Sequence, residues 1–463
     1  MNDATGRSSD FAGHHLSRLR AVIEGAVITP ADPGYDDARA VFLGDVDIRP
    51  AVIVRVAGVD DVCRVVALAG ETGLELAVRG GGHSAAGYGL SEGGIVLDVR
   101  SLDALEFDAD GRAAWAGSGL AAGVFTKEAA ERGLAVGFGD TASVGLGGIT
   151  LGGGVGYLSR AFGLTIDSLL AAEIVTADGR IRHVDAETEP DLFWAIRGGG
   201  GNLGVVTRFR YRLVDLPSVY GGMLILPATP ETVAGFVAAA DAAPDALSTI
   251  ANVMPCPPMP FVPAEHHGRT VILATMVYAG DAVGGERAVA PLRDLAAPIA
   301  DQVRPMRYPE IYPPEDPSYR PRAVVRNLYV DRIGEDEART IVERVEASDA
   351  AMRVVQLRVL GGAVDRVPVD ATAYAHRGRR IMVQLAAFYG DEAERVARRE
   401  WEKDLAAAIT NGPPAAYANF LGDEGEARVR EAYPGRTWDR LAEIKRRYDP
   451  TNLFHRNQNV PPA

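Results

Sequence analysis

Four glycine-rich segments hold the residues with the clearest chemical potential. They are residues 79–84, residues 145–156, residues 197–204 and the pair at 361–362. Glycine has no Cβ, so backbone N–H groups in such turns can approach a phosphate closely, and several that point the same way bind an anion. The segments therefore indicate a large phosphate-bearing cofactor.

His83 is the candidate nucleophile of the first segment, which reads Arg79-Gly-Gly-Gly-His83-Ser84. We expect its loop to offer no apolar face that would bury the ring. Most single histidines of this kind are structural, but an imidazole can attack an electrophilic carbon, and the glycines beside it favour chemistry. The other histidines lack metal-ligand spacing, so no metal site is predicted.

Two other activities are disfavoured by the motifs. The segment Gly199-Gly-Gly-Asn-Leu-Gly204 matches the dinucleotide fingerprint, but a predicted helix precedes it and a predicted strand follows it, the reverse of a Rossmann NAD site. Tight turns between elements remain the alternative for this segment. Hydrolysis is disfavoured because there is no Gly-x-Ser-x-Gly elbow and neither Cys63 nor Cys256 lies in a nucleophile motif.

The elements that must position these segments follow from hydrophobic periodicity. In the first part we expect strands at 52–56, 76–78, 95–99 and 205–211, helices from 60, at 122–132 and at 190–197, and a hairpin at 173–184 around Asp178-Gly179. Residues 145–156 show no clear period and are interpreted as loops. From 220 to about 412, strands such as 270–277 and 381–388 alternate with helices such as 335–346, and the chain ends in a helix at 438–448 and a polar tail at 452–459.

Composition excludes several classes of protein. The 463 residues suggest two domains, and the net charge of −14 disfavours nucleic-acid and membrane partners. Two cysteines are too few for a disulfide framework, and the amino terminus carries no apolar signal segment. We therefore expect a cytoplasmic protein, as a monomer or homodimer, that acts on a small molecule.

Taken together, the ordered motifs resemble the FAD-linked oxidases of the berberine bridge enzyme and 6-hydroxynicotine oxidase type, in the vanillyl-alcohol oxidase superfamily. The resemblance runs from about Tyr35 to the end. It rests on the His83 segment, on Val144-Gly-Leu-Gly-Gly148 with Leu151-Gly-Gly-Gly154, on Asp191-Leu-Phe-Trp194 leading into residues 197–206, and on Tyr448-Asp-Pro-Thr-Asn452-Leu-Phe454 with Asn457-Gln-Asn459.

The resemblance implies an α+β, two-domain FAD-binding fold of the vanillyl-alcohol oxidase (PCMH) type. Residues 1–216 plus 413–463 would form the FAD-binding domain, and residues 217–412 a substrate-binding domain with an antiparallel sheet covered by helices. The residues implied at the cofactor are Arg79, Gly80, Gly81, Gly82, His83, Ser84, Gly87, Thr141, Val144, Gly145, Gly147, Gly148, Gly153, Gly154, Tyr157, Gly204, Val206, Asn457 and Asn459.

The resemblance also implies that His83 carries FAD covalently through its 8α-methyl group. Many relatives have a second tether, a cysteine three positions before the valine of the Val-Gly-x-Gly-Gly motif, but Thr141 stands there in this chain. A single covalent bond is therefore expected. Val144 matches a position where dioxygen approaches the flavin, although simple loop packing explains it equally well.

Tyr417 is the residue that the resemblance implies for substrate deprotonation. The family's Tyr-x-Asn-Tyr segment reads Tyr417-Ala-Asn-Phe420 here, so the first tyrosine is kept and the second is lost. A phenol of pKa near 10 needs help from neighbours to act as a base at neutral pH. A catalytic or substrate-anchoring role and a plain core position remain equally open for Tyr417.

The expected activity is an FAD-dependent oxidation. Hydride would leave a C–H bond of an alcohol, amine, sugar or secondary-metabolite intermediate, and O2 would reoxidise the flavin to give H2O2. The alternatives are a flavin dehydrogenase that uses another electron acceptor and a catalytically silent flavoprotein that only binds a ligand.

Overall fold

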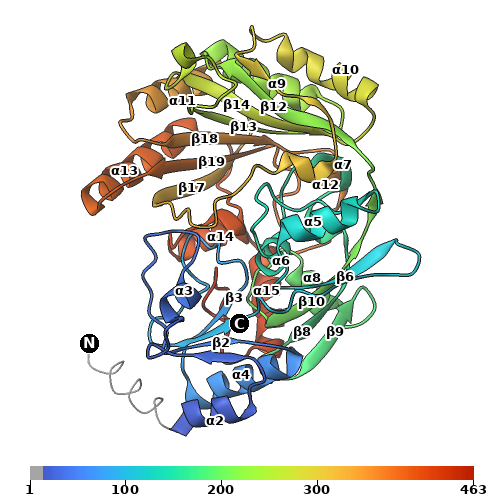
Figure 1. Cartoon of the computed structure of the whole chain (residues 1–463), viewed down its shortest axis with the longest axis vertical. Coiled ribbons are helices and arrows are strands. Elements are labelled where there is room, and N and C mark those ends of the chain that lie inside the picture. Colours follow the sequence, from blue (N-terminus) through green and yellow to red (C-terminus); the bar gives the residue numbers. More distant parts are fainter. Residues whose placement is uncertain (1–13) are drawn as a thin grey trace.

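The computed structural model describes residues 14–463, in which two α/β regions at one end support a large antiparallel sheet at the other (Figure 1). The first region is a four-stranded sheet in the order β1-β2-β4-β3. Its strands are β1 (Ala26–Ile28), β2 (Val52–Arg55), β3 (Leu76–Arg79) and β4 (Ile95–Asp98), and its helices are α2 (His14–Val22), α3 (Tyr35–Arg39) and α4 (Val59–Thr72).

The strands of this first sheet confirm the predicted β-α-β order. Strand β4 pairs in parallel with both β2 and β3, and α4 makes the crossover. Parallel strands covered on both faces need continuous apolar runs, which explains why β2 and β4 read Val-Ile-Val and Ile-Val-Leu. The apolar face of α4, with Val62, Val65 and Val66, packs in the same core.

The second region is a five-stranded antiparallel sheet in the order β5-β6-β10-β8-β9. Its strands are β5 (Leu105–Phe107), β6 (Ala113–Gly117), β8 (Leu169–Val175), β9 (Ile181–Asp185) and β10 (Val205–Arg212). Around it lie α5 (Ala122–Ala130), α6 (Leu146–Gly152), α7 (Ser159–Phe162), α8 (Pro190–Ile196), the 3-10 turn η1 (Thr165–Asp167) and the short pair β7 (Leu134–Ala135) with β11 (Val214–Asp215).

Two predictions for this region are confirmed and one is wrong. Strands β8 and β9 form the predicted hairpin, with Gly179 at φ +71 in its turn, and the order α8, glycine segment, β10 confirms the reversed arrangement that excluded a Rossmann site. Residues 145–156 are not all loop, because they contain α6. Five glycines in or next to this helix conceal its period, so the sequence pattern missed it.

The third region is an eight-stranded antiparallel sheet with the main order β15-β12-β14-β13-β18-β19-β17 and β16 paired beside β12. Its strands are β12 (Val219–Pro227), β13 (Leu247–Pro255), β14 (Thr270–Tyr278), β15 (Ala300–Asp301), β16 (Arg304–Met306), β17 (Ala323–Val330), β18 (Arg353–Val359) and β19 (Ile381–Phe388). Helices α9 (Pro230–Ala242), α10 (Ala282–Arg293), α11 (Glu335–Ala347) and α13 (Glu392–Ile409) cover its outer face (Figure 1). Short turns η2 (Ala264–His266), η3 (Tyr308–Ile311) and α12 (Ala363–Arg366) complete it.

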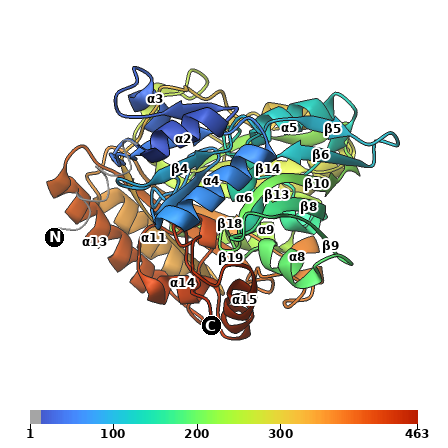
Figure 2. The ribbon, with the colours of Figure 1, turned by 90° about the horizontal axis from the view of Figure 1, so that it is seen from below.

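The carboxyl-terminal segment returns to the first two regions. It comprises η4 (Ala418–Phe420), α14 (Glu426–Ala432) and α15 (Arg436–Tyr448), and the view from below shows α15 near α8 (Figure 2). Apolar residues of this segment, such as Leu421 and Leu441, share one core with Phe125 and Phe209. The fold is thus α+β, with the expected antiparallel sheet covered by helices. We propose the domain boundaries at 216/217 and 412/413, where the chain enters and leaves the third region.

Buried arginines join the third region to the rest. Arg377 makes two hydrogen bonds of 2.7 Å to the Asp167 carboxylate, and Arg358 lies 2.7 Å from Asp140. Arg160 donates to the carbonyl oxygens of Leu360 and Ala243 at 2.6 and 2.7 Å. Because a buried charge without partners is costly, these contacts define how the two halves of the molecule meet.

We predict that Arg377→Met destabilises the protein by about 3–5 kcal/mol, because it leaves the nearly buried Asp167 carboxylate without its bidentate partner. Thermal unfolding measures the effect. Arg112→Met, which removes an exposed pair with Asp215 (side chains 67% and 72% exposed), should cost less than about 1 kcal/mol. Equal effects of the two substitutions would contradict the assignment of Arg377 as an anchor between the two halves.

Candidate functional site

Two glycine loops from distant parts of the chain touch at the candidate site. The loop 80–84 follows β3, and the loop 141–145 precedes α6. A Cβ on Gly81 would lie 2.4 Å from the nitrogen of Gly145, and a Cβ on Gly145 would lie 2.5 Å from the nitrogen of Gly81. Backbone occupies both places, so only glycine allows this approach.

This contact brings His83 next to the second loop. Its Nε2 lies 3.1 Å from Ser143 Oγ, and its ring stacks on Phe42 with a centroid distance of 4.6 Å. The expectation of a ring without apolar contact is therefore wrong. Phe42 lies about forty residues before His83 in the chain, so the sequence around His83 gives no sign of this contact. Burial lowers the pKa of His83, and the nearby Glu315 opposes that shift. The imidazole is neutral at pH 7, as a nucleophile must be.

The space beside His83 has the groups that a phosphate-bearing cofactor needs. The backbone N–H groups of residues 80–84 donate no hydrogen bond to any described residue. A Cβ on Gly148 would meet nothing within 4 Å, and one on Gly80 would meet only the Ser118 carbonyl at 4.0 Å. The buried Ser118 hydroxyl has no partner among residues 14–463. Free donors, open space and an unpaired hydroxyl together fit FAD.

Three residues predicted at the cofactor shape the first loop from within. The buried Arg79 guanidinium donates to the carbonyl oxygens of Ala38 and Ala40. Burial, reinforced by Arg100, lowers the pKa of Arg79 to about 10. Ser84 Oγ accepts the N–H of Tyr88 at 3.3 Å, and Gly87 adopts φ +67 in the following turn.

The second glycine segment holds Tyr417. A Cβ on Gly153 would lie 2.9 Å from the Tyr374 ring, and the backbone of Gly153 has φ +132, which only glycine adopts easily. The next residue, Gly154, donates its N–H to the Tyr417 phenol oxygen at 2.9 Å, and Asn419 Nδ2 donates to the same oxygen at 3.0 Å. The structure thus places Gly153 and Gly154 against Tyr417.

The environment of Tyr417 acts on its pKa in two directions. Burial is the larger effect and raises the pKa above its ordinary value, while the hydrogen bonds from Gly154 and Asn419 lower it. The phenol is therefore protonated at neutral pH. Two N–H donors aimed at one oxygen also stabilise negative charge that develops there during proton transfer.

The remaining predicted residues occupy different surroundings. Thr141 is half-buried with its hydroxyl 3.4 Å from Asp140 Oδ1, and Val144 is half-buried with its carbonyl accepting the N–H of Ala122. Gly147 donates its N–H to the Ser118 carbonyl at 2.8 Å. Tyr157 packs edge-on against Tyr312 at 6.1 Å, toward the third region.

Gly204 directly precedes β10, and Val206 lies where β10 begins to pair with β8. A Cβ on Gly204 would lie 2.4 Å from the Val175 carbonyl oxygen, and Val206 is 4% exposed within the core. Both residues therefore pack the sheet.

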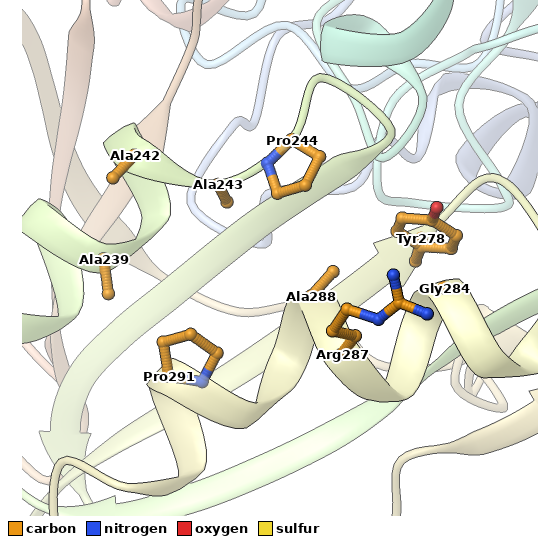
Figure 3. A pocket seen from close by; sticks show the side chains of 9 residues that line it. All are labelled: Ala239, Ala242, Ala243, Pro244, Tyr278, Gly284, Arg287, Ala288 and Pro291. Atoms are coloured by element: carbon orange, nitrogen blue, oxygen red, sulfur yellow. The ribbon is translucent and has the colours of Figure 1, made fainter.

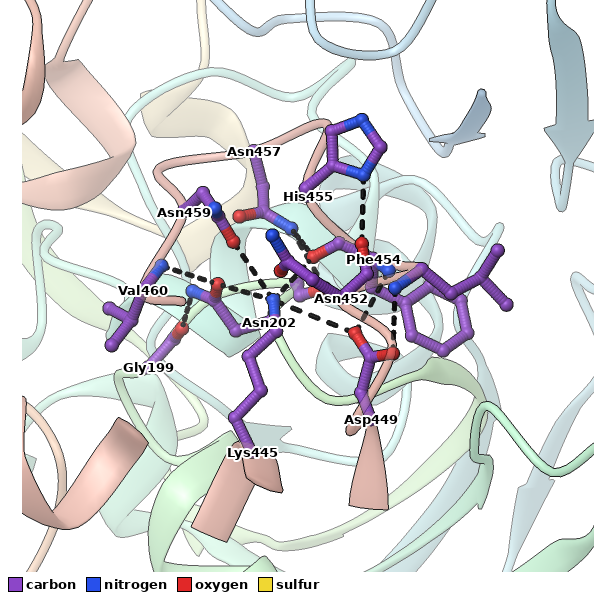
Figure 4. A network of polar contacts seen from close by, with 12 residues as sticks. Gly199, Asn202, Lys445, Asp449, Asn452, Phe454, His455, Asn457, Asn459 and Val460 are labelled. Atoms are coloured by element: carbon purple, nitrogen blue, oxygen red, sulfur yellow. Dashed lines mark hydrogen bonds and ion pairs between the residues drawn. The ribbon is translucent and has the colours of Figure 1, made fainter. Parts of the chain in front are cut away.

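A buried lysine organises the carboxyl-terminal strap, defined here as residues 449–460 (Figure 4). The Lys445 ammonium is fully buried, donates to the Phe454 carbonyl at 2.8 Å and to Asn459 Oδ1 at 2.9 Å, and lies 3.6 Å from Asp449 Oδ2. Burial lowers the pKa of Lys445 to about 8. Asn459, predicted at the cofactor, thus holds the strap.

The same network fastens the strap to the third glycine segment (Figure 4). Asn202 Nδ2 donates to the Gly199 carbonyl at 2.8 Å, and Asn202 Oδ1 accepts the N–H of Val460 at 2.9 Å. Asn457 Nδ2 donates to the carbonyls of Gly201 and Phe454, while its buried Oδ1 has no partner among the described residues. That oxygen is a free acceptor for a cofactor.

The structure adds residues that the sequence analysis did not select. Phe42, Ser118, Ser143, Glu315 and Lys445 all touch the site or its supports, and Glu315 Oε1 accepts the N–H of Ala142 at 2.8 Å. A single serine or phenylalanine outside a motif gives no local signal. Only Lys445, a charge on the apolar side of its helix, could have been singled out.

Other features of the described chain carry no comparable chemistry. A hollow of about 270 Å³ lies between α9 and α10, lined mainly by alanine and proline with Tyr278 and Arg287 (Figure 3). Residues 14–463 contain no cluster of three potential metal ligands, and no helix among them is long and apolar enough to cross a bilayer. Cys63 and Cys256 are free thiols.

Comparisons with known proteins find relatives over most of the chain. Residues 50–185 match a family model described as an FAD binding domain, and residues 416–461 match one described as berberine and berberine like. (R)-6-hydroxynicotine oxidase from Paenarthrobacter nicotinovorans is 32% identical over 455 residues, which cover 95% of this chain and 97% of that protein. The FAD-linked oxidoreductase YvdP of Bacillus subtilis is 29% identical, with 95% and 99% covered.

Solved structures share the fold. The crystal structure of 6-hydroxy-D-nicotine oxidase from Arthrobacter nicotinovorans superposes with a TM-score of 0.82 at 29% identity, covering 95% of this chain and 98% of that one. A glucooligosaccharide oxidase from Acremonium strictum, described with a 6-S-cysteinyl, 8α-N1-histidyl FAD, superposes with a TM-score of 0.84 at 23% identity, with 97% and 100% covered.

We predict that Lys445→Met lowers the unfolding free energy by about 3–5 kcal/mol and weakens FAD retention, because it leaves Asp449 buried without its cation and frees Asn459. Thermal unfolding and the ratio of flavin to protein absorbance measure the two effects. Lys403→Met, at an exposed lysine of α13, is the control and should change neither. Wild-type stability and flavin content in Lys445→Met would show that the strap does not depend on this amine.

Proposed function

The chain belongs to the FAD-linked oxidoreductases of the berberine bridge enzyme and 6-hydroxynicotine oxidase type, and from that premise we propose that it is an oxidase of a small organic substrate with O2 as electron acceptor. A substrate C–H and an adjacent O–H or N–H would be converted to a double bond, while O2 becomes H2O2. Bound FAD would supply the hydride acceptor for this reaction. The single observation that carries the proposal is His83, a neutral imidazole beside a cradle of free N–H groups.

We propose that His83 is the single covalent anchor of FAD. His83 Nε2 is hydrogen-bonded to Ser143 Oγ, whereas His83 Nδ1 has no hydrogen-bond partner among the described residues. Nδ1 is therefore the nitrogen free to bond the 8α carbon. That bond would replace a C–H bond of the methyl group, and the two electrons and two protons released would pass to O2 to give H2O2. A second anchor has no candidate at Thr141, because an alkyl hydroxyl is a poor nucleophile without a base beside it.

The two cysteines support the single anchor. Cys63 lies in α4, and the buried Cys256 follows β13 at the far end of the third region. Burial raises the pKa of both thiols, so neither is an activated thiolate.

We propose that Tyr417, once its phenol has given its own proton to water, takes the substrate O–H or N–H proton. Its oxygen is held by Gly154 and Asn419, and those donors stabilise the charge that a departing proton leaves behind. Tyr417 lies in one apolar cluster with Val155 of the second region and Met382 of the large sheet, so it stands where the two domains face each other.

The covalent anchor is tested by acid precipitation followed by peptide mass mapping. We predict that wild-type flavin stays on the peptide containing His83 and that His83→Ala releases all of its flavin. Ser143→Ala should lower the covalent fraction, because the ring loses the contact that orients it. His183→Ala, at an exposed histidine, is the matched control and should retain the flavin. Wild-type flavin found entirely in the supernatant would refute the anchor.

The role of Tyr417 is tested by Tyr417→Phe. We predict a fall in kcat of about 10²–10⁴-fold with unchanged flavin content, because the proton acceptor is lost and the packing is kept. Turnover is followed as H2O2 release with the first active compound from a screen of alcohols, amines and sugars. Tyr374→Phe, whose hydroxyl bonds Tyr329 at 2.6 Å, should lose less than about tenfold. Near wild-type turnover of Tyr417→Phe would make Tyr417 a core residue.

The same assay distinguishes the electron acceptor of the wild-type enzyme. Rapid flavin reduction by a substrate without H2O2 release would identify a dehydrogenase.

A further inference from the structure

One segment of the third region crosses to the FAD-binding domain beside the proposed covalent anchor. This crossing segment, residues 312–322, connects η3 to β17. At its start the Tyr312 hydroxyl donates to the Gly139 carbonyl at 3.2 Å. Near its end the Pro321 carbonyl accepts the N–H of Gly44 at 2.9 Å. The crossing segment is therefore fastened to the FAD-binding domain at both ends.

Gly44 and Gly139 lie in the two stretches of chain that contact the His83 ring. Phe42 is two positions before Gly44, and its ring stacks on the imidazole. Ser143 is four positions after Gly139, and its Oγ lies 3.1 Å from the imidazole Nε2. The crossing segment thus fastens the chain next to both groups that orient the histidine.

Glu315 extends this hold to the loop of Ser143 itself. Its Oε1 accepts the N–H of Ala142 at 2.8 Å and the N–H of Ser143 at 3.4 Å. Hydrogen bonds to a carboxylate are stronger than those to a neutral acceptor, and here two successive N–H groups share one oxygen. A side chain of the third region therefore fixes the backbone of the residue that is hydrogen-bonded to His83.

The negative charge of Glu315 also acts on the imidazole. Burial lowers the pKa of His83, and the charge of Glu315 is the largest effect in the opposite direction, while Arg320 adds a smaller lowering. Glu315 forms no ion pair with any residue of 14–463, so no other side chain there neutralises it. Glu315 is thus an unneutralised carboxylate that favours positive charge on the His83 ring.

Covalent attachment places such a charge on the ring. His83 Nδ1 would form a bond to the 8α carbon with its lone pair, and one C–H bond of the methyl group would break. The ring stays cationic until Nε2, which donates to Ser143 Oγ, releases its own proton to water. The two electrons and two protons set free would pass to O2 and give H2O2. A carboxylate already in place beside the ring stabilises this charge as it develops.

Resting on the proposed anchor at His83, we propose that Glu315 is a positioning residue for covalent attachment of FAD. It holds the loop 141–145 against the imidazole, and its charge offsets the positive charge that attachment creates on the ring. Because Glu315 belongs to the third region, the attachment site is complete only when that region has docked on the FAD-binding domain. Covalent attachment therefore follows domain docking.

The test follows covalent attachment in the full-length chain, purified without flavin from riboflavin-starved cells and then mixed with FAD in air. Flavin that stays with the acid-precipitated protein is measured over time. We expect Glu315→Gln to attach FAD roughly tenfold more slowly than the wild type, because the amide keeps the size and an acceptor oxygen but loses the charge. The melting temperature should not change. Adding Glu315→Gln to His83→Ala should leave the affinity for non-covalent FAD unchanged, as measured by flavin fluorescence.

The pH profile of the attachment rate separates charge from packing. Attachment needs a neutral imidazole, so the rate should rise with pH through the pKa of His83. Because Glu315 raises that pKa, Glu315→Gln should move the midpoint to lower pH while its plateau stays below that of the wild type. Asp316→Asn makes the same change in the next residue, whose carboxylate accepts only from Ser318, and should alter neither the rate nor the midpoint.

The outcomes distinguish this role from the anchor itself. A wild-type rate in Glu315→Gln, a slower rate without a shift of the midpoint, or an equal slowing in Asp316→Asn would overturn the role of Glu315. Wild-type protein that binds FAD but never attaches it would refute the anchor at His83 instead.

Discussion

Two loops that lie some sixty residues apart in the chain can meet only because Gly81 and Gly145 carry no side chains. Their contact brings the His83 ring to Ser143, and the N–H groups of residues 80–84 beside it have no hydrogen-bond partner among residues 14–463. A methyl group at either glycine would separate the nucleophile from its partner loop and close the cradle.

The join between the two domains depends on buried cations whose hydrogen bonds are largely satisfied. Arg377 and Arg358 are paired with carboxylates of the FAD-binding domain, and Arg160 is held by backbone carbonyls of the third region. Lys445 is a buried cation of the same kind, and it holds the carboxyl-terminal strap by donating to the Phe454 carbonyl. Replacing such contacts leaves a buried charge or carbonyl alone, so the relative position of the domains is specified more sharply than apolar packing alone would achieve.

That position determines the chemistry available to a substrate. Tyr417 is buried between Val155 of one domain and Met382 of the other, and its oxygen is held by Gly154 and Asn419. On the sheet above, Arg358 is neutralised by Asp140, and the buried Asn327 keeps an Nδ2 donor that has no partner among residues 14–463. We therefore propose that attachment of the cofactor depends on the glycine loops, whereas choice of substrate depends on the sheet.

The sequence by itself determined the elements and the family, because hydrophobic periodicity, the turn at Asp178-Gly179 and the ordered glycine motifs are local signals. It located His83, Thr141 and Tyr417, and it excluded a Rossmann site from the order of α8 and β10. It missed α6, whose glycines conceal the helical period. Only the tertiary structure decided that Phe42 stacks on His83, that Arg79, Gly204 and Val206 support the fold, and that Glu315 holds the loop of Ser143. These facts depend on strand register and domain docking, which join residues up to hundreds of positions apart and therefore leave no trace in any local pattern.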